Sequence, residues 1–365
     1  MNRIKLLDSM RGLAATIVVF HHVYTSFNSI FTANFSSLVL NIFAFISNLN
    51  VQAVLFFFFL SGFTICLSVW QNLPLTKNSF SKYIYRRLKR ILPLYYIAIA
   101  FTFVCGWLAN TILANEDFSI KNLLGNVFFL QCSKAYHGNW FTPYGNNGPL
   151  WSISFEMYYY WLMPLFLLCI LAITKAKNFT SFTNCVALVA AFIISITCVL
   201  INYFFFFPFV AFTALFYVWY VGFFSAWLYI NKKIKMDLNF ILLVTLMLVL
   251  ILIHCKAPSA TIQKLIFGAA ISVLFYLLFL LRRKISIGFT SIAEYFFNCI
   301  FYKIGTGSYA LYLLHYPILL LLKYKGYNTS VCLGFTLIIL IVCSIWLEKK
   351  VSKISFLFLK RHYIK

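Results

Sequence analysis

Apolar runs of about 20 residues, separated by short polar or basic segments, recur from one end of the chain to the other. A run of that length can cross the hydrocarbon core of a bilayer as a helix. The pattern predicts an all-α fold, a polytopic membrane bundle in which a shorter apolar piece at 38–47 is re-entrant or interfacial. The predicted spans lie at 11–29, 51–70, 91–110, 150–174, 184–202, 209–230, 238–255, 262–281, 305–322 and 329–347.

The distribution of basic residues tests this count of about ten transmembrane helices. Ten spans put both termini on the same side of the membrane, and the segments on that side hold 24 of the 30 Lys and Arg residues. Cytoplasmic segments of membrane proteins are enriched in Lys and Arg. Both termini are therefore predicted to be cytoplasmic, and the net charge of +23 is interpreted as a topology signal rather than a nucleic-acid surface.

Composition supports the same interpretation. Charged residues make up 10% of the chain, whereas soluble domains carry roughly 25%. The ten cysteines contain no CxxC pair and lie mostly within apolar runs, so we expect small buried hydrophobes and no metal site. The first run contains two histidines and no cleavage pattern, so we expect a retained span. The predicted organisation is a membrane domain over 1–350 and a short basic tail over 351–365.

The stretch VVFHHVY, residues 18–24, places two histidines inside the first span. At 100° per residue, His22 lies about 20° from the helix face of Arg11, whereas His21 is turned about 80° to the other side. Asp8 can pair with Arg11 at i, i+3. His22 is therefore the stronger functional candidate, and His21 is expected to contact a neighbouring helix. The alternative is that both histidines only hydrogen-bond to other helices.

WSISFEMYYYW, residues 151–161, contains Glu156, an acid within the fourth span. Ser152, Tyr159 and Tyr160 share its helix face and can hydrogen-bond to it. Burying an ionisable group in a membrane costs a few kcal/mol, so such a group is a functional candidate. Glu156 could exchange protons in catalysis, pair with an arginine, or couple protons in a transporter.

Further polar groups accompany two other spans. Ser308, Tyr312 and His315 fall on one face of the ninth span. Ser61 and Gly62 lie mid-way along the second, where a small pair often indicates close helix packing. The cluster RRLKR at 86–90 precedes the third span and suits either topology or phosphate binding.

The longest predicted outer loop runs from Ile112 to Pro149. Its end, HGNWFTPYGNNGPLW, is rich in Gly, Asn, Pro and aromatic residues. Such a loop either only connects two spans or forms a surface on which a sugar stacks and hydrogen-bonds.

Five of these patterns, in this order, resemble the acyltransferase-3 family of integral membrane O-acyltransferases. The family patterns are Arg-x10-His, Ser-Gly-Phe, Arg-x-x-Arg, Trp-x4-Glu and Ser-Tyr-x-x-Tyr-Leu-x-His. In this chain they occur as Arg11 to His22, Ser61-Gly62-Phe63, Arg87 to Arg90, Trp151 to Glu156, and Ser308 to His315. The Arg-x10-His spacing selects His22 over His21.

The resemblance implies an enzyme of the bacterial inner membrane that transfers an acyl group, usually acetyl from acetyl-CoA, to a carbohydrate hydroxyl. Implied acceptors are surface polysaccharides or lipid-linked glycans such as lipopolysaccharide O-antigen or exopolysaccharide. The catalytic candidates are His22, Glu156 and His315, and the acyl-CoA-binding candidates are Arg11, Arg87, Arg90 and Ser61. Some family members carry an appended SGNH-hydrolase-like domain. This chain lacks one, so we expect either transfer by the membrane domain alone or a separate partner protein.

Two rival functions remain at this point. A proton-coupled transporter or flippase of a glycan would use Glu156 and the histidines as coupling groups, although the chain lacks the repeats of many transporters. An assembly protein would use the same polar residues only to hold helices together. For the enzyme, direct transfer and an acyl-enzyme intermediate are both open.

Overall fold

The computed structural model describes residues 5–70, 73, 76–132, 141–176, 180–205, 215–230, 289–327 and 329–362. Helices dominate this part of the chain, and Gln131 and Phe141 form an isolated bridge. The elements are α1 Lys5–Ser26, α2 Asn28–Asn34, α3 Ser37–Asn48, α4 Asn50–Val69, α5 Lys77–Leu108, η1 Glu116–Phe118, α6 Ile120–Val127, η2 Tyr144–Asn146, α7 Leu150–Thr174, α8 Ser181–Phe205, α10 Phe216–Ile230, α13 Phe289–Thr306, α14 Ser308–Tyr324 and α15 Ser330–His362.

Several of these helices are long and apolar enough to cross a membrane. Among the described residues, four segments meet both conditions: Ser37–Val69, Asn78–Leu108, Leu150–Thr174 and Ser330–Lys353. A fifth is reached if the bent pair of α13 and α14 counts as one span. The all-helical fold is thus confirmed for the described residues, with four or five candidate spans, whereas the count of ten and the side of the termini stay predictions. The predicted spans at 238–255 and 262–281 lie outside the described residues.

Two helix boundaries differ from the sequence prediction in ways that matter for the site. The apolar piece at 38–47 is α3, and it leads directly into α4. The basic cluster at 86–90 lies inside α5, because Thr76 and Ser79 form a capping box that begins this helix well before the apolar run. Arg87 and Arg90 are therefore three residues apart on a helix and share one face.

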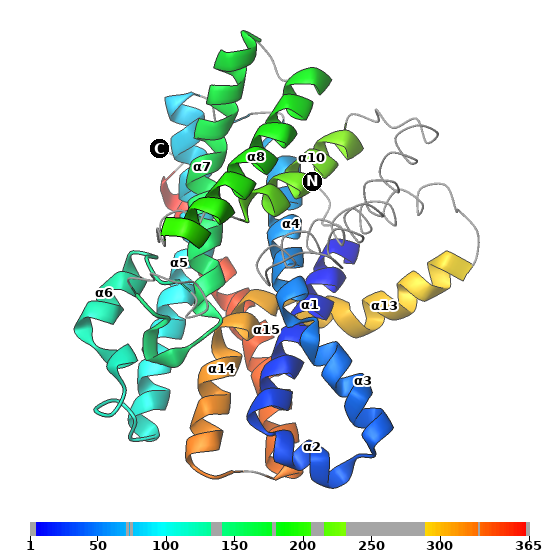
Figure 1. Cartoon of the computed structure of the whole chain (residues 1–365), viewed down its shortest axis with the longest axis vertical. Helices are drawn as coiled ribbons and strands as arrows, with labels where there is room; N and C mark the ends of the chain where they lie inside the picture. The colour runs from blue at the N-terminus through cyan, green and yellow to red at the C-terminus, as the bar shows by residue number, and fades with distance from the viewer. Residues whose placement is uncertain are drawn as a thin grey trace.

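α4 lies near the centre of the bundle, in contact with α1 and α10 (Figure 1). A Cβ atom at Gly62 would collide with the carbonyl oxygen of Trp219 in α10, and one at Gly222 would collide with that of Phe59 in α4. The two backbones touch because neither glycine has a side chain. The packing role proposed for the Ser61-Gly62 pair thus belongs to Gly62.

α1 crosses α13 by the same device, with Gly12 against the backbone of Phe301 and Gly305 against that of Asp8. α13 projects to one side of the bundle in Figure 1 and is bent by 68° relative to α14. The bend lets α14 begin inside the bundle, where it packs against α1, α5 and α15.

Between α5 and α7, the segment that contains η1, α6 and η2, here called the outer segment after its predicted side of the membrane, contacts α5 and α14. Buried amides fasten it. Asn126 Nδ2 donates to the Thr142 carbonyl over 2.8 Å, and its Oδ1 accepts from Tyr144 N over 3.0 Å. Gln131 Nε2 donates to the Leu150 carbonyl over 2.9 Å, at the start of α7. The sugar-binding interpretation of this loop rests partly on residues 137–140, which are not among those described.

Candidate active site

The first component of the site is a cavity of about 80 Å³ between α1, α4, α5, α7 and α14, here called the arginine chamber. It is defined by Arg11, Ser61, Arg87, Arg90, Glu156 and Tyr309. Five of the seven predicted site residues meet here from four different helices. Three cationic side chains around one opening suit a ligand that carries phosphate groups.

Glu156 is held from two sides in this chamber. Ser61 Oγ donates to Glu156 Oε1 over 2.7 Å, and the Tyr160 hydroxyl also donates to Oε1. Trp219 Nε1 reaches Ser61 Oγ over 3.4 Å. Of the three side chains predicted to hydrogen-bond to Glu156, Tyr160 does so. Ser152 bonds to Tyr312 instead, and Tyr159 packs against the rings of Phe58 and Phe216. Two donors to one carboxylate oxygen fix the acid in place.

Two of the arginines are also oriented by hydrogen bonds. Arg11 Nη1 lies 3.3 Å from Asp8 Oδ1, which is the predicted i, i+3 pair, and its Nη2 donates to Thr64 Oγ1 over 3.0 Å. Arg87 Nη2 donates to Ser68 Oγ over 2.5 Å, and its guanidinium carbon lies 5.5 Å from the centre of the Tyr83 ring. Both guanidinium groups keep further N–H donors for a ligand.

The second component is a cavity of about 250 Å³, here called the histidine chamber. It is defined by His22, Asn50, Asn146, Gly148, Trp151 and Tyr312. By the sequence-based topology, its wall comes from the outer segment, whereas the arginines of the other chamber lie toward the cytoplasm. The two chambers therefore approach each other from opposite ends of the bundle.

His22 and His21 have different surroundings. His21 Nδ1 lies 2.9 Å from Ser47 Oγ and 3.0 Å from the Ser47 carbonyl oxygen, so this residue ties α1 to α3. The His22 ring has no hydrogen-bond partner among the described residues. It lies 5.2 Å from the His315 ring and 4.6 Å from the Tyr316 ring, centre to centre. The structure thus places His21 in a helix contact, whereas His22 lines the histidine chamber with no hydrogen-bond partner among the described residues.

His315 is fully buried beside His22. Its Nδ1 lies 3.0 Å from the Leu311 carbonyl oxygen, which can only accept, so Nδ1 carries the proton. In the neutral ring Nε2 is then an acceptor, and it has no partner in the described part of the chain. The imidazole of His315, in a fixed tautomer, therefore lies next to the imidazole of His22.

Asn147 connects this histidine pair to the outer segment. Pro317 lacks an N–H, so the Leu313 carbonyl, four residues earlier, loses its helical partner. Asn147 Nδ2 supplies one, donating to the Leu313 oxygen over 3.2 Å and to Thr102 Oγ1 over 3.0 Å. One buried amide thus joins α5, α14 and the wall of the histidine chamber.

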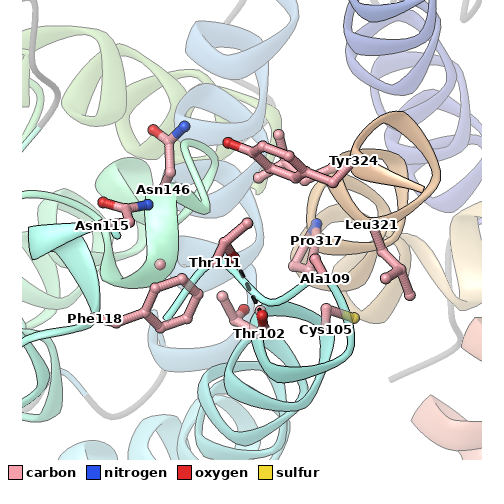
Figure 2. A pocket seen from close by; sticks show the side chains of 13 residues that line it. Thr102, Cys105, Ala109, Thr111, Asn115, Phe118, Asn146, Pro317, Leu321 and Tyr324 are labelled. Atoms are coloured by element: carbon pink, nitrogen blue, oxygen red, sulfur yellow. Dashed lines mark hydrogen bonds between the residues drawn. The ribbon is translucent and has the colours of Figure 1, made fainter. Parts of the chain in front are cut away.

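A third, small cavity of about 20 Å³ lies where the outer ends of α5 and α14 meet η1 and η2 (Figure 2). Thr102, Cys105 and Thr111 face Pro317, Leu321 and Tyr324 across it, with Asn115 and Asn146 nearby. Its volume fits about one water molecule. It is a packing gap at the outer edge and too small for a substrate.

Sequence reasoning missed Glu348, at the end of the predicted tenth span. Its Oε2 accepts from the backbone N–H groups of Tyr309 and Ala310, each over 3.2 Å. The carboxylate of α15 thus caps the first turn of α14, the helix that carries Ser308, Tyr312 and His315. Two basic residues, Lys349 and Lys350, follow Glu348 and made it resemble an ordinary surface charge.

The geometry brings six of the seven predicted site residues into two adjoining cavities, and the seventh, His315, lies beside His22 outside both. One cavity offers cationic groups and a fixed carboxylate, and the other offers an open imidazole with polar and aromatic walls. Within the described residues, no group of three or more His, Cys, Asp and Glu side chains could hold a metal ion. This arrangement suits a transfer reaction in which an anionic donor and a hydroxyl-bearing acceptor enter from different sides.

Comparison with known proteins gave one informative result. Neither the curated proteins nor the solved structures gave a significant match. The acyltransferase-3 family model, described as an acyltransferase domain, matches residues 4–347. This range includes every residue that lines the two chambers. Because the match covers nearly the whole sequence, the chain belongs to the acyltransferase-3 family of membrane acyltransferases.

Proposed function

We propose that this protein is an acyl-CoA-dependent O-acyltransferase of the bacterial inner membrane. It transfers an acyl group, acetyl in the first instance, from acyl-CoA to a hydroxyl of a surface polysaccharide or lipid-linked glycan such as O-antigen or exopolysaccharide. One observation carries the proposal. A chamber with three arginines and a chamber with an open histidine adjoin each other within the bundle of an acyltransferase-family chain.

The donor side follows from charge and size. Acyl-CoA carries several phosphates, and Arg11, Arg87 and Arg90 supply bidentate N–H donors for them. The chamber, at about 80 Å³, has room for about three waters, which is too little for a whole nucleotide. The phosphates therefore bind at the mouth, where Arg90 is exposed, and the acyl end of the molecule extends inward.

The acceptor side follows from His22. A neutral imidazole takes the proton from the acceptor hydroxyl, and the hydroxyl oxygen bonds to the acyl carbonyl carbon. The carbon–sulfur bond breaks, and coenzyme A leaves as the thiol after it takes up a proton. In the alternative route His22 accepts the acyl group first and passes it on. Asn50, Asn146 and the ring of Trp151 offer the polar and stacking contacts that a sugar uses.

Glu156 and His315 assist the arginines and His22. Glu156 shares the arginine chamber with the cations, where it balances their charge and relays to the departing thiolate the proton that His22 takes from the acceptor hydroxyl. The His315 ring lies 5.2 Å from the His22 ring, centre to centre, and its Nε2 carries no proton, so we assign His315 the role of stabilising a proton on His22 during the reaction.

Mass spectrometry of surface glycans from cells with and without the gene tests the proposal. A gain of one acetyl mass on a sugar in the expressing cells is expected. Loss of the whole glycan without the gene would instead indicate a flippase or transporter. Unchanged glycans in both strains would indicate an assembly protein and overturn the enzyme assignment.

A further inference from the structure

Tyr312 occupies a special position between the two chambers. Of the described residues that line them, Tyr312 alone lines both. The side chain is buried, 5% exposed, on the α14 face that also carries Ser308 and His315. Its ring lies 5.7 Å from the Phe57 ring on one side and 6.1 Å from the His315 ring on the other, centre to centre. The Tyr312 ring therefore lies at the boundary between the arginine chamber and the histidine chamber.

A hydrogen bond holds the ring in this position. The Tyr312 hydroxyl lies 2.8 Å from Ser152 Oγ, and Ser152 Oγ donates to the Pro149 carbonyl over 3.2 Å. A serine hydroxyl has one proton, so Tyr312 is the donor in the first bond. Pro149 itself lines the histidine chamber. The ring is thus fastened to the wall that an acceptor would touch.

The two chambers also differ in their capacity for water. At about 30 Å³ per water, the histidine chamber holds about eight waters and the arginine chamber about three. Water competes with any acceptor for an acyl thioester. In that side reaction a water oxygen bonds to the carbonyl carbon, the carbon–sulfur bond breaks, and a free carboxylic acid and the coenzyme A thiol result. Excluding water from reactive groups is a common task of enzyme interiors.

We propose that Tyr312 is a gate between the donor and acceptor chambers, latched by Ser152, which keeps the thioester from water until an acceptor occupies the histidine chamber. The inference rests on the proposed function, because it takes the arginine chamber as the donor site. Tyr312 acts here as a positioning residue: its ring closes the passage, and its hydroxyl sets how often the passage opens.

The test uses the full-length protein in lipid nanodiscs with acetyl-CoA alone. Release of free thiol without any acceptor measures the leak, and a separate binding measurement gives the Kd for coenzyme A. Tyr312→Ala removes the ring and is expected to raise thiol release at least tenfold. Tyr312→Phe and Ser152→Ala remove only the latch, and each is expected to raise thiol release roughly 2- to 10-fold, as loss of one buried hydrogen bond implies. Tyr324→Phe, at the outer end of the same helix and outside both chambers, is the matched control and keeps the wild-type rate.

Each outcome decides a different point. Unchanged thiol release in the three gate variants, with coenzyme A binding retained, overturns the gate. Should Tyr312→Ala fail to bind coenzyme A, the two latch variants decide in its place. An acyl adduct on Tyr312 in the intact protein, found by peptide mass spectrometry, overturns it as well, because the hydroxyl would then be reacting rather than closing a passage. Failure of the wild-type protein itself to bind coenzyme A overturns the proposed function instead.

Discussion

Ser61 of α4 and Glu156 of α7, 95 positions apart in the chain, are joined by a 2.7 Å hydrogen bond inside a cavity that also contains three arginines. The serine hydroxyl donates, so Glu156 accepts as a carboxylate oxygen would. A fixed acid among these cations means that part of their positive charge is already balanced by the protein itself. This balance has consequences for how strongly an anionic donor binds.

Replacing Glu156 by Gln removes one negative charge from the arginine chamber while keeping the side chain's shape. We expect coenzyme A to bind more tightly, because Arg11 and Arg87 lose a competing anion, while the acyl transfer rate falls because no acid remains to move a proton. Isothermal titration and a transfer assay measure the two effects. Weaker binding in Glu156→Gln would show that the acid supports the donor rather than competes with it.

Truncating Arg90 to Ala should raise the Kd for coenzyme A by roughly 10- to 100-fold, since a charge-assisted hydrogen bond contributes about 1.5–3 kcal/mol. Lys82→Ala is the matched control, because Lys82 is an exposed cation on the same helix outside both chambers. If both variants bind coenzyme A as the wild type does, the basic cluster serves topology alone.

The two adjacent histidines should respond differently to alanine. His22→Ala is expected to lower acetylation by about 100- to 10,000-fold, the usual contribution of a general base, with unchanged protein levels in the membrane. His21→Ala loses a contact with Ser47 and should cost about 0.5–1.5 kcal/mol of stability with most activity retained. Glycan mass spectrometry and immunoblotting report both. Full activity in His22→Ala would remove this residue from the mechanism.

Glu348→Ala should destabilise α14 by about 1 kcal/mol, as loss of a helix cap does, and should lower the transfer rate because α14 carries Tyr312 and His315. Glu348→Gln keeps an acceptor oxygen and should be milder. Thermal unfolding in detergent and the transfer assay measure these changes. Lys349→Ala, at the exposed neighbouring position, serves as the control; equal effects at 348 and 349 would contradict the cap.

Gly62→Ala should destabilise the protein by about 1–3 kcal/mol, because the added Cβ collides with the Trp219 carbonyl and forces α4 away from α10. Gly334→Ala in α15 is the matched control, because nothing lies within 4 Å of a Cβ there. Fluorescence-detected thermal unfolding compares the two. Equal melting temperatures would mean that the α4–α10 contact yields easily.

The sequence predicted those parts of the molecule that depend on one helix at a time. Hydrophobic run length predicted the span at 150–174, and the structure has α7 at Leu150–Thr174. Helical periodicity separated His22 from His21 and paired Asp8 with Arg11. Each of these inferences uses the spacing of residues within one segment, which can be read directly from the sequence.

Contacts between distant helices could not be predicted in the same way. Glu348 reaches Tyr309 across 39 positions, and Asn147 reaches the Leu313 carbonyl across 166. The residues next to Glu348 and Asn147 in the sequence do not indicate these bonds. The partner of Glu348 is an N–H group at the start of a helix, and the partner of Asn147 is a carbonyl that Pro317 leaves without a helical donor. The family resemblance implied acyl-CoA binding for Ser61 and catalysis for Glu156, and it did not indicate that the two side chains bond to each other.

The buried amides that fasten the outer segment have a consequence for substrate choice. Asn126, Gln131 and Asn147 bond to backbone atoms and hold the wall of the histidine chamber at fixed positions. Each wall that is held by several hydrogen bonds keeps its shape when a ligand arrives, so a ligand of the wrong shape loses contacts. We therefore expect strict recognition of the recipient sugar.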